Sequence, residues 1–197
     1  YSRLHDKVSA VGGALITSPA QYKHCHYLPE WYPLCEAFTP ETVFAARDAD
    51  FAAALADKDW PAYFVKDHVK SLTTQRGSVA ASPQEVAEVV ALIEQYRGVL
   101  EGGACIRKFE RLVAATEERY FVLHGRAYAR EGDAPALAHE LARRIDSPFF
   151  SADLVLSEDG ALRLIELGDG QVSDRKNWSA EQFVSMLRAS QALVRTT

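Results

Sequence analysis

FFSADLVLSEDGALRLIELGDGQ, residues 149–171, is the stretch of sequence that decides the fold. Two short apolar runs flank Asp159-Gly160, a dipeptide that readily supplies the positive φ angles of a tight hairpin turn. The pattern therefore predicts a β-hairpin, with Asp153 on its first strand and Glu166 near the end of its second. With the turn at Asp159-Gly160, these two carboxylates are expected to be close to cross-strand partners.

Two carboxylates that face each other repel unless a cation or a shared proton lies between them. Hard oxygen ligands that leave room for water and phosphate suit Mg²⁺ better than zinc. The hairpin is therefore a candidate magnesium site, and Asp169 follows in the next loop. A structural hairpin with one solvated acidic face is the alternative, and this stretch alone does not separate the two interpretations.

The composition is that of an ordinary globular protein. With 48% hydrophobic and 25% charged residues, 197 residues can bury a sizeable core as one domain or as two small lobes. The net charge of −5 gives no overall attraction to nucleic acid or to an anionic membrane. No apolar run approaches the roughly 20 residues that span a bilayer, and no signal-peptide pattern is present. We therefore expect a cytoplasmic protein without a membrane or nucleic-acid partner.

The three cysteines, Cys25, Cys35 and Cys105, are odd in number and widely spaced. This favours reduced thiols over a disulfide framework.

Residues 1–60 carry the weakest signals. The chain begins with Tyr1 and not with Met, so we expect this region to be short and open to truncation of its natural N-terminus. Pro29 and Pro33 are expected to prevent a long helix, and residues 50–56 to form a short one. His24-Cys25-His26 could bind a metal, but no second cluster at zinc-finger spacing follows it, so a structural zinc site is not predicted.

A cationic loop follows the first predicted buried strand. The strand YFVK, residues 63–66, ends in Lys66, and the loop over residues 67–78 adds Lys70, Arg76, a glycine and several hydroxyls. Freed backbone N–H groups together with cations can form a phosphate cradle. The loop lacks the glycine spacing and the Gly-Lys-Ser/Thr ending of a Walker loop, and a solvated loop between two strands is the alternative.

The remaining signals alternate between helices and strands. Ser82 to Glu85 is a capping box with Pro83 at the first helical position, and it predicts a helix that ends at Arg97-Gly98. Residues 104–110 are predicted to form a strand, and residues 118–123 and 126–130 a second hairpin across His124-Gly125. Helices are expected over residues 134–146 and onward from a second capping box at residues 179–182.

The order of these parts resembles the ATP-grasp superfamily. The resemblance covers roughly residues 60–190 and is carried by YFVKDHVKS at 63–71 and IELGDGQ at 165–171. These segments look most like a bacterial and phage clade marked by one Arg and two Lys, here Arg107, Lys66 and Lys70. The resemblance implies an α+β fold in which two lobes with antiparallel sheets clamp ATP and couple its cleavage to carboxylate activation. It also implies an N-terminal region at 1–60 and an ATP-grasp domain at 61–197, with lobes at 61–108 and 109–197.

The resemblance further implies roles for single residues. Arg119 would meet the transferred phosphoryl group and Lys70 would be a second catalytic cation. Asp153 and Glu166 would hold Mg²⁺. Many family members place Asn two residues after the second-strand Glu; this chain has Gly168 there, so Asp169 is expected to supply the missing oxygen. The implied ATP-binding residues are Lys66 and Lys70 on the phosphates, Arg76, Gly77 and Ser78 in the closing loop, Arg107, and the adenosine-reading hinge of Lys108, Phe109 and Glu110.

The predicted function is an ATP- and Mg²⁺-dependent ligase that joins a carboxylate to an amine through an acyl-phosphate. Such an enzyme works by charge neutralisation and positioning, which explains why cations and carboxylates dominate the candidates. Its substrates would be small-molecule or peptide carboxylates and amines. The alternatives are a small-molecule kinase, in which the same clamp phosphorylates a hydroxyl, and a nucleotide-binding module without turnover.

Overall fold

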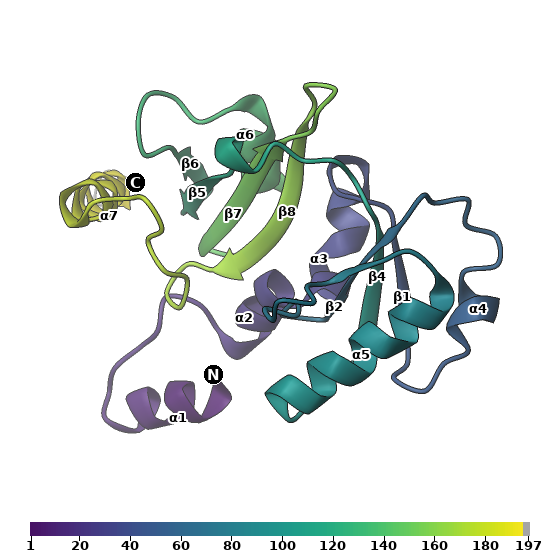
Figure 1. Ribbon diagram of the computed structural model, residues 1–197. Helices are drawn as coiled ribbons and strands as arrows, with labels where there is room; N and C mark the ends of the chain where they lie inside the picture. The colour runs from purple at the N-terminus through teal and green to yellow at the C-terminus, as the bar shows by residue number, and fades with distance from the viewer. Residues whose placement is uncertain (195–197) are drawn as a thin grey trace. The chain divides into compact units, whose positions relative to one another are not determined.

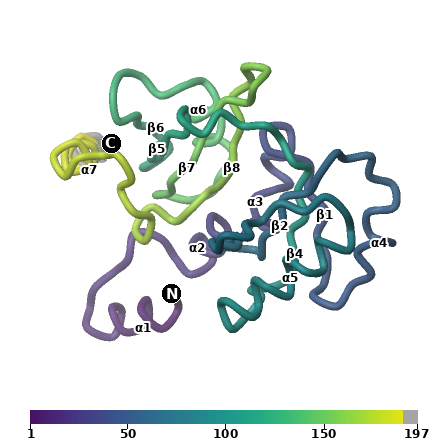
Figure 2. The backbone as a smooth tube through the Cα atoms, in the orientation of Figure 1, coloured from purple at the N-terminus to yellow at the C-terminus, as the bar shows by residue number. Residues whose placement is uncertain are grey.

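The computed structural model describes residues 1–194 and contains two compact units. Unit 1 comprises Tyr1–His26, Glu30–Phe38 and the chain from Leu112 onward, and unit 2 comprises Tyr27–Pro29 and Thr39–Arg111. The chain thus starts in unit 1 in purple, passes through unit 2 in blue and teal, and returns to unit 1 in green and yellow (Figures 1 and 2). Residues 1–60, predicted as a separate region, are shared between the two units. The passage after Arg111 lies close to the predicted lobe boundary at residue 108.

Unit 2 is built on a four-stranded antiparallel sheet with the strand order β1-β4-β2-β3. Helix α5 (Pro83–Arg97) packs on β2 and β3, and the short α4 (Phe51–Ala54) lies against α5 and β1 (Figure 1). The buried stripe of α5 covers the apolar side chains of the strands and makes the core of this unit. The strands are β1 (Thr42–Ala45), β2 (Tyr63–Asp67), β3 (Val79–Ala80) and β4 (Ala104–Lys108).

Helix α5 has the ends that its sequence predicts. The Ser82 hydroxyl accepts a hydrogen bond from the Glu85 backbone N–H at 3.2 Å, and the Glu85 carboxylate accepts one from the Ala81 N–H at 3.1 Å. Gly98 ends the helix in the left-handed region at φ 76°. The predicted capping box and glycine stop are confirmed.

Unit 1 contains a second antiparallel sheet of four strands with the order β6-β5-β7-β8. Its strands are β5 (Glu118–Leu123), β6 (Arg126–Tyr128), β7 (Phe149–Leu156) and β8 (Leu162–Asp169). Both predicted hairpins are confirmed: β5 and β6 turn at His124-Gly125, and β7 and β8 turn at Asp159-Gly160, where Gly160 has φ 85°. Two sheets with helices give the predicted α+β class.

Helices lie against this second sheet. Helix α7 (Ala180–Val194) begins at the predicted capping box, where the Ser179 hydroxyl accepts from the Gln182 N–H at 3.1 Å. Its side chains pack on Phe121 and Phe149 beside Trp178. Helix α6 (Ala136–Arg144) packs on β5 and β6. The strand β7 also meets the 3₁₀ turn η2 (Ala114–Thr116).

The first 38 residues form short helices that the sequence did not predict. They are α1 (Ser2–Ala10), α2 (Pro19–His26), α3 (Leu28–Cys35) and the 3₁₀ turn η1 (Glu36–Phe38). Helix α3 runs through Pro33, because Leu28 and Trp31 are buried and packing outweighs weak helix propensity. Within unit 1, α2 packs against β8. No helix among residues 1–194 is both long enough and apolar enough to cross a bilayer.

We predict that all three thiols resist modification in the native protein. Burial raises the pKa of Cys25 and Cys105 to about 12 and the pKa of Cys35 to about 11. Labelling with a disulfide reagent at pH 8 should therefore be slow in buffer and complete in denaturant. Because the unfolded chain releases thiol protons near pH 9 that the native chain keeps, stability should fall as pH rises from about 9. Rapid native labelling of a cysteine would contradict this.

Candidate functional site

Two predicted phosphate-binding cations share one face of the sheet in unit 2. Strand alternation turns Val65 and Ile106 towards α5, so Lys66 and Arg107 point to the other face, on neighbouring strands. Both side chains are buried, at 6% and 4% exposure. One guanidinium nitrogen of Arg107 donates to the Thr39 hydroxyl at 2.5 Å. The structure thus brings two of the three clade-marking cations together.

The third of these cations, Lys70, lies in a loop that Asp67 organises. The fully buried Asp67 carboxylate accepts hydrogen bonds from the backbone N–H groups of Val69 at 2.7 Å, Lys70 at 2.5 Å and Glu101 at 3.2 Å. It also forms an ion pair with Arg97 at the end of α5. The Lys70 carbonyl in turn accepts from the Asp67 N–H at 2.9 Å. This network fixes the backbone that carries the exposed Lys70 side chain.

The loop predicted to close over phosphate is tied to its own unit. Arg76 donates to the Val79 carbonyl at 2.6 Å and to the Glu85 carboxylate at 3.2 Å. Gly77 adopts φ 66°, a conformation in which glycine is favoured. Ser78 is buried, and its hydroxyl accepts from the Leu72 N–H at 2.8 Å. Ser78 therefore holds the loop together, and its hydroxyl is turned inward.

The predicted adenosine-reading hinge follows β4. The backbone N–H groups of Lys108 and Phe109 donate to the carbonyls of Glu41 at 2.7 Å and Ala62 at 2.9 Å. The side chains of Lys108, Phe109 and Glu110 are all half-buried. The roles of these three residues towards adenine and ribose remain predictions.

Arg119, Asp153 and Glu166 form a row across three strands of unit 1. The register places Arg119 of β5 opposite Asp153 of β7, and Asp153 opposite Glu166 of β8. The predicted cross-strand pairing of the two carboxylates is therefore confirmed. Arg119 binds Asp153 through two hydrogen bonds, from Nε to Oδ1 at 2.8 Å and from Nη2 to Oδ2 at 2.7 Å. Asp153 is 2% exposed and the Arg119 side chain 10%.

A second cation reaches Asp153 from the segment after β8. Nζ of Lys176 lies 2.8 Å from Asp153 Oδ2 and also contacts Glu117. Asp174 binds the remaining side of Arg119, with its carbonyl 3.0 Å and its carboxylate 2.9 Å from Nη1. The Trp178 indole N–H donates to the Arg119 carbonyl at 2.9 Å. The segment of residues 170–178 is thus folded onto the buried carboxylate.

These contacts keep both cations charged. Burial by itself lowers the pKa of Arg119, but the hydrogen bonds and charge of Asp153 outweigh it, so that this pKa is raised overall. Burial likewise lowers the pKa of Lys176, and hydrogen bonds to Asp153 and Glu117 more than reverse that effect. Lys176 also has a left-handed backbone, φ 45°, which costs a non-glycine residue about 1–3 kcal/mol.

The structure does not bring Asp169 to this row. Asp169 pairs with Phe150, so strand alternation turns its side chain to the face opposite that of Asp153 and Glu166. Its buried carboxylate accepts from the Thr17 hydroxyl at 2.5 Å and from the Gln171 N–H at 3.0 Å. Asp169 here joins the turn before α2 to the end of β8.

Gly168 lies on the same face as Glu166, and two hydroxyls crowd it. A Cβ atom at this position would lie 2.7 Å from Ser173 Oγ and 3.0 Å from Ser151 Oγ. The two hydroxyls are hydrogen-bonded to each other at 2.7 Å. The absence of a side chain at position 168 therefore lets the 170–178 segment fold back onto the sheet.

The donor set of the row fits a divalent cation. Asp153 and Glu166 are hard oxygen donors, and Mg²⁺ commonly binds one or two carboxylates and completes its shell with water and phosphate. No cluster of three His, Cys, Asp or Glu suited to a metal occurs within the described 194 residues, so a protein-only cage is not formed there. Four negative and two positive side chains meet, leaving a formal charge of −2: Asp153, Glu166, Glu117, Asp174, Arg119 and Lys176.

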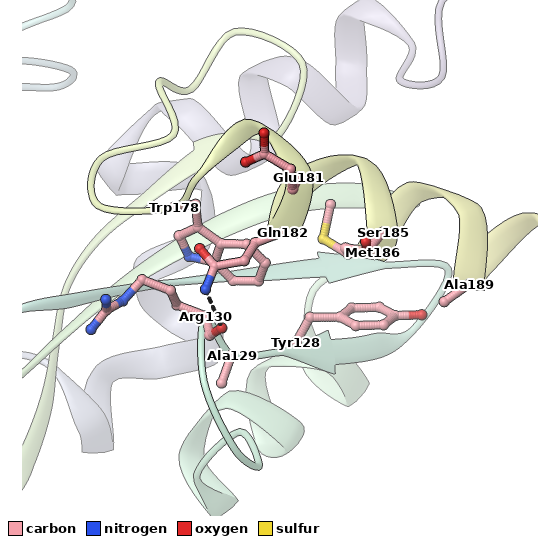
Figure 3. Close-up of a pocket in the computed structure, with 9 residues that line it drawn as sticks. All are labelled: Tyr128, Ala129, Arg130, Trp178, Glu181, Gln182, Ser185, Met186 and Ala189. Carbon is pink, nitrogen blue, oxygen red and sulfur yellow. Dashed lines mark hydrogen bonds between the residues drawn. The ribbon is translucent and has the colours of Figure 1, made fainter.

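A pocket of about 390 Å³ lies on the same side of this sheet, beside α7 (Figure 3). Tyr128 pairs with Phe121, two residues after Arg119, which sets the shared face. Trp178 lines the pocket, and the Gln182 side chain spans it to the Arg130 carbonyl at 3.1 Å. None of the residues labelled in Figure 3 is a predicted site residue.

An ATP-grasp domain model, for family 3 of the clade named after its one Arg and two Lys residues, matches residues 30–187 of this sequence. The chain belongs to this family. The resemblance found in the sequence is thereby confirmed, together with the ATP-grasp fold. No curated protein matches the sequence significantly.

Solved structures of ATP-grasp proteins share the fold. D-cycloserine synthetase DcsG has a TM-score of 0.63 and 17% identity, over 99% of this chain and 78% of that chain. Cdc123 from Schizosaccharomyces pombe has a TM-score of 0.60 and 16% identity, over 87% and 94%. The ATP-grasp ligase PsnB, complexed with a phosphomimetic variant of its minimal precursor, Mg and ADP, has a TM-score of 0.60 and 14% identity, over 96% and 66%. At these identities the similarity establishes the fold alone.

Sequence reasoning missed Asp67, Lys176 and Trp178. Asp67 was visible as the first loop residue after a strand, where a carboxylate often accepts backbone N–H groups. Lys176 and Trp178 lie in a segment without periodicity, and their contacts with β5 and β7 depend on the fold. No local signal could have identified them.

We predict that Asp67→Asn destabilises unit 2 by about 1.5–3 kcal/mol, the range for hydrogen bonds to a charged group. The amide cannot replace the ion pair with Arg97 or accept from all three backbone N–H groups. Urea denaturation followed by Trp60 fluorescence would measure the loss. Asp57→Asn is the matched control, because the Asp57 side chain is 75% exposed and its replacement should change stability by less than about 0.5 kcal/mol. Equal midpoints for the two variants would refute the role of Asp67.

Proposed function

We propose that the chain is an ATP- and Mg²⁺-dependent ligase that joins a carboxylate to an amine through an acyl-phosphate. The observation that carries the proposal is the row of Arg119, Asp153 and Glu166, in which a guanidinium stands directly beside two paired carboxylates. Phosphoryl transfer needs cations where phosphate charge develops and carboxylates that can hold a metal. The row offers both on one sheet face.

We assign phosphate binding in unit 2 to Lys66, Lys70 and Arg107. Lys66 and Arg107 are buried on the face that α5 leaves uncovered, and the Asp67 network fixes the backbone at Lys70. Hydrogen bonds from Lys and Arg to phosphate oxygens are among the strongest that side chains make, and neighbouring cations suit a polyanionic ligand. Lys108, Phe109 and Glu110 are assigned to adenosine, and Arg76, Gly77 and Ser78 to the architecture of the loop.

In the proposed reaction, a substrate carboxylate oxygen attacks the γ-phosphorus of ATP, and the bond from that phosphorus to the β–γ bridging oxygen breaks to release ADP. The amine nitrogen then attacks the acyl carbon, phosphate leaves, and the nitrogen loses a proton. Arg119 would neutralise the transferred phosphoryl group. The Asp174 contact is the one that a phosphoryl oxygen can replace, because the Asp174 side chain is 79% exposed while Asp153 is buried. A bound Mg²⁺ would supply further neutralisation of phosphate charge.

The pocket beside α7 is our candidate for a substrate group. Its volume of about 390 Å³ is in the range of small-molecule sites. Trp178 belongs both to the pocket lining and to the contacts of Arg119, so a group bound there would lie near the proposed phosphoryl site. Its mixed aromatic and polar lining suits a small molecule or the side chain of a peptide.

We predict that Lys66→Ala weakens binding of a non-hydrolysable ATP analogue by about 1.5–3 kcal/mol, as expected for a lost contact to a charged group. Lys58→Ala should leave the affinity unchanged, because Lys58 pairs with Glu41 and Asp57 on the surface of the same unit. Calorimetric titration of both variants makes the comparison. Wild-type affinity in a folded Lys66→Ala protein would remove Lys66 from the site.

We further predict that the protein forms hydroxamates from a panel of carboxylates when ATP, Mg²⁺ and hydroxylamine are present. Hydroxylamine traps an acyl-phosphate without requiring the natural amine. The signal should depend on the carboxylate, and Arg119→Lys should lower it at least about tenfold, because an ammonium cannot bind two carboxylate oxygens in the planar geometry of a guanidinium. A phosphorylated hydroxyl product would instead establish a kinase. ATP binding with no ADP release over the whole panel would favour a binding module.

A further inference from the structure

The cation that occupies Asp153 in this structure is Lys176. Its Nζ lies 2.8 Å from Asp153 Oδ2, and Arg119 holds both oxygens of the same carboxylate from the other side. The position open to a metal ligand bond at Asp153 Oδ2 is therefore already taken by an ammonium. Its three N–H donors and single positive charge satisfy the buried carboxylate in place of a metal.

We propose that Lys176 is a built-in counter-ion that competes with the divalent cation for Asp153 and thereby sets the cation affinity of the site. The proposal rests on the proposed function, since it takes Asp153 and Glu166 as the metal-binding pair. With Lys176 at Asp153, a free divalent cation must displace an ammonium before it can bind. Divalent-cation binding therefore becomes weak in the absence of nucleotide and strong only when phosphate oxygens add ligands and negative charge.

The backbone holds Lys176 in position at a cost. The residue adopts φ 45°, where glycine or asparagine would be less strained, and its N–H donates to the Asp174 carboxylate at 2.9 Å. A strained backbone at a residue whose side chain reaches a buried charge is the pattern of a position kept for its side chain. The Lys176 side chain is 28% exposed, so it can leave Asp153 without a large rearrangement of the core.

Gly168 connects this device to the sheet. Ser173 Oγ occupies the space that a Cβ atom at position 168 would need, and its backbone N–H donates to the Asp169 carbonyl at 2.9 Å. Ser173 thereby sets the path of the chain three residues before Lys176. A side chain at position 168 would push this segment away from β7 and β8, and Lys176 with it.

The test measures Mn²⁺ binding to the full chain without nucleotide, by electron paramagnetic resonance of the free ion. Lys176→Gln should bind Mn²⁺ roughly tenfold more tightly than the wild type, because one positive charge beside the ligands is gone. Lys176→Arg should bind like the wild type. Lys23→Gln is the matched control: it removes the same charge from the same unit, at a surface pair with Glu30, and should also bind like the wild type.

Two further variants localise the effect. Adding Glu166→Gln to Lys176→Gln should abolish the gain, because the gain arises at the carboxylate pair. Gly168→Ala should raise the affinity in the same direction as Lys176→Gln, and the double variant should bind no more tightly than Lys176→Gln alone, which is the signature of two changes that act through one contact. Lys176→Met serves if the glutamine variant fails to fold, since it keeps the length of the side chain and removes the charge.

The outcomes separate this inference from the proposed function. Equal Mn²⁺ affinity of the wild type, Lys176→Gln and Lys176→Met would overturn the competition. If Mn²⁺ with a non-hydrolysable ATP analogue still binds in a manner that depends on Asp153, the proposed metal pair stands without it. If Asp153→Asn leaves Mn²⁺ binding unchanged with and without the analogue, the metal pair itself is wrong, and this inference falls with it.

Discussion

The arrangement of unit 1 depends on one buried carboxylate. Asp153 lies in the middle strand-to-strand row of the sheet at 2% exposure, and an ionised group in such a place is costly unless charges and hydrogen bonds compensate it. Arg119 supplies a two-bond contact and Lys176 a third. Because Lys176 comes from the chain beyond β8, compensating Asp153 also fixes the 170–178 segment. Trp178 and the start of α7 follow directly from that segment, so that one charge on β7 organises the C-terminal part of the unit.

Unit 2 solves the same problem with the opposite sign. Its sheet has an apolar face under α5 and a face that carries the buried cations Lys66 and Arg107. At the end of β2, the buried Asp67 gathers backbone N–H groups and Arg97 and sets the turn that bears Lys70. In each unit, therefore, local apolar packing makes the sheet, and a buried ionic group arranges the loop that carries the candidate chemistry.

Sequence predicted the elements whose signals are local. The capping boxes at Ser82 and Ser179, the Asp159-Gly160 turn and the opposition of Asp153 and Glu166 all follow from short-range geometry, and the structure has them. The helices of residues 1–38 were missed because their stability comes from packing of residues such as Trp31, and not from propensity. The contacts of Lys176 were beyond reach for a related reason: they join β7 to a distant segment of the chain that has no periodic pattern. Of the fold, the family order of motifs gave the class; of the site, it gave the candidate residues but not their partners.

The faces of β8 show why spacing along a strand decides a ligand set. Moving an acid from position 168 to position 169 keeps the composition of the motif but turns the side chain through the sheet, since strand residues alternate with a period of two. On that far side Asp169 meets Thr17 and the Gln171 N–H, and it becomes part of the packing against α2. The near side then has no side chain at Gly168, and the Ser173 hydroxyl fills the space. A shift of one residue thus exchanges a possible metal ligand for a folded-back segment, and that segment brings an ammonium to the carboxylate where a metal ion would otherwise be the natural counter-charge.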